Sequence, residues 1–135
     1  MIKSFLICDS SGFSFYSKKI DQKFEDIQPE LLSGLISAIG TIGRELFKEE
    51  IATISYGDND KFQLTIISKE IFGSDKILYF VFILEGESDI KKMRQLCTNI
   101  FIEAKHVLKN PHNGGVDIQG KIDRLLDNRY DLKTI

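Results

Sequence analysis

The chain has 135 residues, of which 42% are hydrophobic and 28% are charged, and its net charge is −2. This balance is typical of one globular domain and gives no general attraction to nucleic acid or anionic lipid. We therefore expect no nucleic-acid partner and only indirect contact with membranes. The longest apolar run, 77–84, is far below the roughly 20 residues that a membrane-spanning helix needs. The opening residues lack the pattern of a signal peptide, so a cytoplasmic protein is expected.

Two short strand-like runs come first. Residues 5–8 are apolar without alternation, which indicates that the strand 2–8 is covered on both faces. A turn of short polar residues and glycine follows at 9–12. The run 13–17 then alternates only partly and leads into two lysines. Lysines discourage further strand pairing, so we expect the second strand at an edge of the sheet.

A long amphipathic helix is predicted from Pro29 to about 48–50. Proline is tolerated in the first turn of a helix, and Glu30 favours the positive end of the helix dipole. Apolar residues then recur at the spacing of one helical face, which we expect to cover the sheet. The members of this expected core face are Leu31, Leu32, Leu35, Ile39, Ile42 and Leu46.

Three more strand-like runs follow, at 51–56, 62–67 and 77–84. A turn signal at 57–60 predicts that the first two of them form a hairpin. The run 77–84 is apolar without alternation, so it belongs in the middle of the sheet beside the first strand. These pairings predict an α+β fold with a five-stranded, mainly antiparallel sheet in the order 2-1-5-4-3. The direction in which the first strand meets the fifth stays open.

A second long helix begins after Ser88, a good N-cap, and ends before Pro111, which cannot continue the hydrogen-bond ladder. A shorter last helix is predicted around 116–126. The first helix is expected to cover one face of the sheet and the later two the other face. The buried stripe of the second helix is predicted to contain Ile90, Met93, Leu96, Cys97, Ile100, Phe101, Ala104, Val107 and Leu108.

The chain is expected to form a single domain over 1–135, because no internal repeat, linker or low-complexity segment divides it. Its core is predicted over 1–109. Residues 110–135 are expected to form a loop, the short last helix and a polar tail.

Neither the cysteines nor the histidines form a recognisable site. Cys8 and Cys97 lie in apolar patterns, as buried free thiols do, and neither has a histidine at a catalytic spacing. His112 has no acid or cysteine at metal-ligand spacing. His106 lies near the end of the second helix, where a cation favours the helix dipole. We therefore predict no enzymatic activity, no metal and no cofactor.

The face of the first helix opposite its expected core face is small and uncharged in its middle. It carries Ser33, Gly34, Ser37, Gly40, Thr41 and Arg44, and Ile36 and Phe47 flank it. A glycine inside a helix costs about 1 kcal/mol relative to alanine, but it lets another backbone approach closely. One interpretation is a docking face for a partner helix or a second copy of the chain. The other is a plain exposed face that happens to be small.

The opening pattern Ile2-Lys3-Ser4-Phe5-Leu6-Ile7-x-x-Ser10-Ser11-Gly12-x-x-x-Tyr16-Ser17 resembles that of longin-domain proteins, as does the order of the predicted elements. Longin domains are close in architecture to the roadblock modules. The stretch 31–39, with the sequence Leu-Leu-Ser-Gly-Leu-Ile-Ser-Ala-Ile, looks like the first helix of short archaeal longin or roadblock-like proteins, which share a profilin-like fold.

This resemblance implies a non-catalytic α-β-α sandwich that works as a dimerising platform. Longin and roadblock modules commonly bind small Ras-like GTPases or act in vesicle-trafficking and tethering complexes, and their dimers often form through the first helix and the neighbouring sheet edge. The expected partners are therefore a second copy or a related longin or roadblock protein, together with a small GTPase. The family offers no invariant functional side chain, so the interface residues are our own prediction from the surface of the first helix and the third strand. They are Ser33, Ser37, Gly40, Thr41 and Arg44 on the helix and Ile51, Thr53 and Ser55 on the third strand.

A small-ligand sensor of the PAS or profilin-like kind is the alternative function, because those domains also have a helix-covered sheet. Such a sensor needs a roomy pocket with a few convergent polar groups. The core predicted from this sequence is instead uniformly apolar.

Overall fold

The structure is a computed structural model of the chain, and it describes residues 1–22, 28–71, 76–109, 115–129 and 132. The strands are β1 (Ile2–Asp9), β2 (Ser14–Lys19), β3 (Ile51–Tyr56), β4 (Phe62–Glu70) and β5 (Ile77–Glu85). The helices are α1 (Pro29–Ile42), α2 (Ile90–Lys109) and α3 (Gly115–Arg129). Two short turns complete the fold: the π-helical turn η1 (Gly43–Phe47) and the 3-10 turn η2 (Asp58–Asp60).

The five strands form one sheet in the order β2-β1-β5-β4-β3. The predicted strand order is confirmed, and so are the two edge strands. All four pairings are antiparallel, including the one between β1 and β5. In that central ladder Phe5 lies opposite Phe82, and the two rings stack with their centroids 4.8 Å apart.

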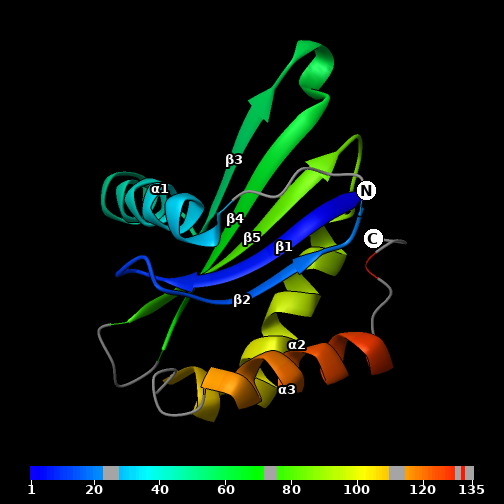
Figure 1. Ribbon diagram of the computed structural model, residues 1–135. Helices are drawn as coiled ribbons and strands as arrows, with labels where there is room; N and C mark the ends of the chain where they lie inside the picture. The colour runs from blue at the N-terminus through cyan, green and yellow to red at the C-terminus, as the bar shows by residue number, and fades with distance from the viewer. Residues whose placement is uncertain (23–27, 72–75, 110–114, 130–131, 133–135) are drawn as a thin grey trace.

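Helix α1 covers one face of the sheet, while α2 and α3 cover the other (Figure 1). Successive residues of the two central strands point to opposite faces, so Phe5 and Phe82 join the core under α2 and α3, while Leu6 and Val81 join the core under α1. This is why 5–8 and 77–84 are apolar without alternation. The predicted layer arrangement is confirmed.

The two later helices bury most of the stripe expected of them. Met93, Leu96, Cys97, Ile100 and Ala104 of α2 are fully buried. Ile90 is an exception, because it lies in the first turn and is 40% exposed. The side chains of 106–109, and with them the predictions for Val107 and Leu108, lie outside the described residues. The members of α3 that pack into the same core are Ile118, Ile122 and Leu126.

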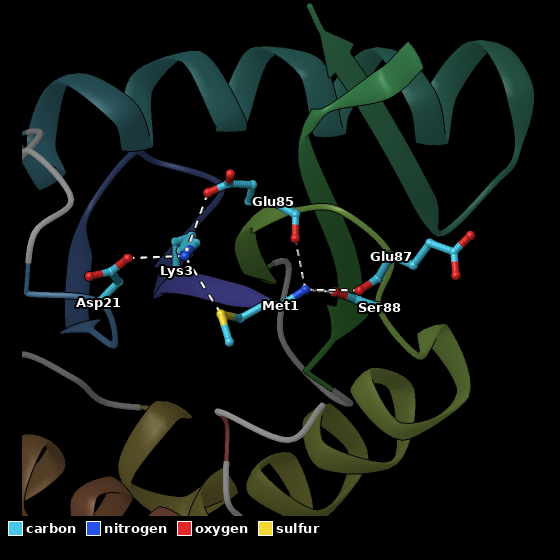
Figure 2. Close-up of polar contacts among 6 residues, drawn as sticks. All are labelled: Met1, Lys3, Asp21, Glu85, Glu87 and Ser88. Carbon is cyan, nitrogen blue, oxygen red and sulfur yellow. Dashed lines mark hydrogen bonds and ion pairs between the residues drawn. The ribbon is translucent and has the colours of Figure 1, made fainter. Parts of the chain in front are cut away.

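Polar contacts fasten the start of β1 to its neighbours (Figure 2). The Lys3 ammonium lies 3.0 Å from a carboxylate oxygen of Asp21 and 3.5 Å from one of Glu85. The hydrogen bond with Asp21 raises the pKa of Lys3 above its usual range. The amino group of Met1 donates to the carbonyl oxygens of Glu85 and Glu87 and to the hydroxyl of Ser88. These contacts hold the end of β5 and the turn into α2 against β1.

The segment between α1 and β3 turns sharply at Lys48. This residue ends η1 in the left-handed region (φ 58°, ψ 32°), and its N–H donates to the carbonyl oxygen of Gly43. A side chain with a Cβ is strained in that region, whereas glycine is not. We expect Lys48→Gly to raise the free energy of unfolding by about 0.5 kcal/mol, as measured by urea denaturation. Glu49→Gly is the control. It is expected to lower stability slightly, because the backbone at Glu49 does not have a positive φ whose strain glycine could relieve.

Candidate functional site

Helix α1 turns Ser33, Ile36 and Gly40 toward the sheet, where all three are buried. A Cβ built on Gly40 would lie within 3.0 Å of three atoms of the Tyr79 ring. The glycine therefore lets α1 approach β5 closely, and the prediction that Ser33 and Gly40 face outward is wrong. Because Ser33 and Gly40 lie on the side of α1 that faces the sheet, they do not form part of an accessible docking face.

The opposite side of α1 exposes a stripe of large apolar side chains, which we call the outward stripe. Most of the residues expected to form the core face of the helix lie in this stripe instead, so the expectation is wrong for Leu31, Leu35, Ile42 and Leu46. Leu32 and Ile39 pack partly against the core under α1. The outward stripe consists of Leu31 (75% exposed), Leu35 (52%), Ile42 (51%), Leu46 (71%) and Phe47 (69%), with the exposed Ala38 near its middle.

The other helical residues of the predicted interface lie along the flank of α1. The hydroxyl of Ser37 donates to the carbonyl oxygen of Ser10 in the turn after β1. Thr41 is half-buried. Arg44 forms an ion pair with Glu70 at the end of β4. Ser37 and Arg44 thus have partners within the chain, and their contact with a second protein stays a prediction.

Strand β3 forms an edge of the sheet, as predicted. It pairs with β4 on one side, and in the part of the chain that the structure describes no strand pairs with its other side. Ile51 is half-buried and packs against the core on the far face of the sheet, whereas Thr53 and Ser55 are exposed. An open edge presents unpaired N–H and C=O groups to another strand. The role of all three residues in an interface stays a prediction.

An apolar hollow of about 460 Å³ lies beside the outward stripe. Leu32 and Leu35 of α1 form one wall, and the ends of three strands form the rest. Its other lining residues are Tyr56 of β3, Phe62, Gln63 and Leu64 of β4, and Ile83 of β5. The outward stripe, the open edge of β3 and this hollow thus adjoin one another on one side of the molecule.

The described residues contain no candidate metal cluster, and their two thiols are not activated. Among them, no group of three or more His, Cys, Asp and Glu side chains lies close enough to hold a metal ion. Burial raises the pKa of the Cys8 thiol to about 12, which removes its nucleophilic form at neutral pH. Burial likewise raises the pKa of Cys97. The side chain of His106 and all of His112 lie outside the described residues.

No helix within the described ranges is both long enough and apolar enough to span a bilayer. This finding concerns the helices of those ranges alone.

The sequence did contain a signal for the outward stripe. From Pro29 to Ile42, α1 carries one charged residue, Glu30, so neither its apolar side nor its side of serine, glycine and threonine has the charged residues of a water-facing surface. A helix that faces water on one side normally carries charged and polar residues there. The missing charged face therefore indicated that either side of α1 could be covered.

No family model matches the chain, and no curated protein matches it. Three solved structures similar to it are MglB proteins. The gliding protein MglB from Thermus thermophilus has a TM-score of 0.53 at 14% identity, covering 70% of this chain and 68% of that one. A structure of MglB with a tetrameric arrangement has a TM-score of 0.53 at 15% identity, with the same coverage. Myxococcus xanthus MglB has a TM-score of 0.52 at 16% identity, covering 80% and 77%. At these identities the likeness shows the fold alone, and this fold is roadblock/longin-like.

Proposed function

We propose that this chain is a non-catalytic interaction module that self-associates through the outward stripe of α1 and η1 and the open edge of β3. The observation that carries the proposal is the outward stripe itself. Soluble monomers rarely expose a contiguous apolar patch of this kind. On this chain the patch continues into an apolar hollow and lies beside an unpaired strand edge.

The apolar area of the outward stripe supports a stable association. Fully burying one leucine, isoleucine or phenylalanine side chain stabilises by about 1.5–3 kcal/mol. Covering the exposed parts of Leu31, Leu35, Ile42, Leu46 and Phe47 would thus contribute roughly 6 kcal/mol per copy. Two copies together give roughly 12 kcal/mol, which lies in the upper part of the roughly 4–15 kcal/mol that association costs in lost freedom. Contacts along β3 would add to this.

The assembled module would act as a platform for a small Ras-like GTPase or a trafficking or tethering complex. Two observations support this. The sequence resembles longin and roadblock modules, which commonly bind such GTPases, and the fold is similar to that of MglB, one structure of which is described as a tetrameric arrangement. The GTPase would bind a surface that self-association leaves free.

Light scattering on a sizing column, run over a dilution series of the purified chain, tests self-association. We expect the mass of a dimer or larger assembly at micromolar concentration and its dissociation on dilution. A monomer at every concentration would rule out self-association and leave the outward stripe to a different protein. Binding of a Ras-like GTPase is tested separately, by titrating GDP-loaded and GTP-loaded forms against the assembly.

The apolar hollow favours a second candidate, the small-ligand sensor. Its volume of about 460 Å³ falls within the range of ligand sites, which is roughly 300–1,000 Å³. Among its lining residues, however, only Tyr56 and Gln63 have polar side chains, and strand alternation directs that of Gln63 to the opposite face of the sheet from Leu64. This is fewer convergent polar groups than a selective site uses. A small molecule released from the purified chain on denaturation, identified by mass spectrometry, would favour the sensor.

A further inference from the structure

The two edges of the sheet differ in how their outward backbone groups are used. In an antiparallel ladder, residue pairs that exchange hydrogen bonds alternate with pairs whose N–H and C=O groups point away from the neighbouring strand. The N–H of Ile20 donates to the carbonyl oxygen of Lys3, so the bonded pairs of β1 and β2 are those in step with these two residues. Ser17 and Lys19 fall between the bonded pairs. Their carbonyl groups therefore point out of the sheet at the β2 edge.

Both of these outward carbonyl groups accept a hydrogen bond from a glutamine side chain. The amide nitrogen of Gln119, in α3, lies 3.3 Å from the carbonyl oxygen of Ser17. The amide nitrogen of Gln22, which follows β2 in the chain, lies 3.1 Å from the carbonyl oxygen of Lys19. These carbonyl groups are the acceptors that an added strand would use. A strand arriving at this edge would have to displace both side chains before its own N–H groups could reach them.

Helix α3 is fastened beside this edge by polar residues at helical spacing. Gln119, Asp123 and Asp127 recur every four positions and so lie on one side of the helix. Asp123 accepts a hydrogen bond of 2.7 Å from the hydroxyl of Tyr16, which is 1% exposed. A carboxylate oxygen of Asp127 lies 3.5 Å from the ammonium of Lys18. Contacts with the residues before and after Ser17 thus hold α3, and with it Gln119, at the β2 edge.

The β3 edge has no such covering. The N–H of Ser68 donates to the carbonyl oxygen of Glu50, and by the same alternation the outward groups of β3 belong to Ile51, Thr53 and Ser55. Within the described ranges, no side chain forms a hydrogen bond with the backbone of these three residues. The acceptors that are occupied at β2 are therefore available at β3.

From these contacts we infer that α3, through Gln119, and Gln22 together close the β2 edge against further strands, so that the sheet can be extended at β3 alone. A sheet with two open edges can add copies without limit, whereas a sheet with one closed edge stops after a single strand pairing. The inference concerns the edge opposite to the proposed interface and does not depend on self-association.

Removal of both amide groups tests the closure. The double variant Gln22→Ala with Gln119→Ala frees the two outward carbonyl groups, and the fold should survive because both glutamines are exposed. The double variant Gln28→Ala with Gln95→Ala is the matched control. It also removes two exposed glutamines, but their side chains form no hydrogen bond with any residue that the structure describes. The masses of wild type and both variants are compared by light scattering over one dilution series.

At the highest concentration we expect the β2 variant to reach about double the wild-type mass or more, because copies then pair at the freed edge, and the control to keep the wild-type mass. Amide hydrogen exchange locates the new contact: the N–H of Ser17 should exchange more slowly in the enlarged assembly than in wild type. A β2 variant that keeps the wild-type mass throughout would overturn the inference. An enlarged assembly in which Ser17 still exchanges as fast as in wild type would also overturn it. A monomeric wild type would remove the proposed function alone, since the inference is read from the difference between variant and wild type.

Discussion

Replacing Leu31 and Leu46 together with glutamate is expected to convert the assembly into a monomer. The dissociation constant should rise roughly 1,000-fold or more, because four leucine side chains per dimer, each contributing about 1–2 kcal/mol, are replaced by charges that must be desolvated. The fold should survive, since these two residues are 75% and 71% exposed. Glutamate at position 31 also lies in the first turn of α1, where a negative charge favours the helix dipole.

A matched control is available on the opposite side of the molecule. Ile90 and Ile102 of α2 are also apolar and exposed, at 40% and 58%, but lie outside the outward stripe. The double variant Ile90→Glu with Ile102→Glu carries the same added charge and is expected to keep the wild-type mass in a dilution series by light scattering. If the α2 variant dissociates as readily as the α1 variant, general charge repulsion is the cause and the outward stripe loses its role.

Gly40→Ala is expected to lower the free energy of unfolding by about 2 kcal/mol. Alanine alone would favour the helix by about 1 kcal/mol, but its Cβ would overlap the Tyr79 ring. That ring is fully buried among Cys8, Ile36 and Val81, so it cannot move without displacing packed neighbours, and overpacking of this kind costs about 1–3 kcal/mol or more. Urea denaturation of the monomeric Leu31→Glu, Leu46→Glu chain measures the change without a contribution from association.

Gly34→Ala, six residues earlier in the same helix, serves as the control. A Cβ at Gly34 meets no atom within 4 Å, so only the gain in helix propensity remains, and stability should rise by about 0.5–1 kcal/mol. The two substitutions are therefore expected to change the free energy of unfolding in opposite directions. Equal gains at both positions would show that α1 does not approach β5 as closely as the structure places it.

The sheet could be predicted from the sequence because each strand carries its own burial pattern. The runs 5–8 and 77–84 are apolar on both faces, which placed β1 and β5 in the middle, and Lys18 and Lys19 placed β2 at an edge. Short turns fixed the hairpins. The direction of the β1–β5 pairing has no such local signal, because it depends on the path of the chain between strands that are distant in sequence.

The candidate site could not be predicted in the same way, because the apolar pattern of α1 fits two orientations. Its large residues and its small residues both recur at helical spacing, and the rule that large apolar residues face the core selected the wrong one. The close approach of α1 to β5 determines which side of the helix faces the sheet. The bulky Tyr79 ring lies beneath the helix, and only a small residue such as Gly40 fits above it. The fit between Gly40 and Tyr79 involves residues of two different elements. The spacing of apolar residues within either element therefore does not reveal it.

The position of β1 beside β5 has a consequence for how the chain reaches its native state. All other strand pairs join strands that are consecutive in sequence, whereas Asp9 pairs with Leu78 and Ile2 with Leu84. Closing a loop of roughly 70 residues costs about 4 kcal/mol of chain entropy before any contact compensates it. The stacked rings of Phe5 and Phe82 thus lie where the two ends of that loop meet. The centre of the finished core is therefore the part that the chain assembles at the greatest entropic cost, and non-local closure of this kind slows folding.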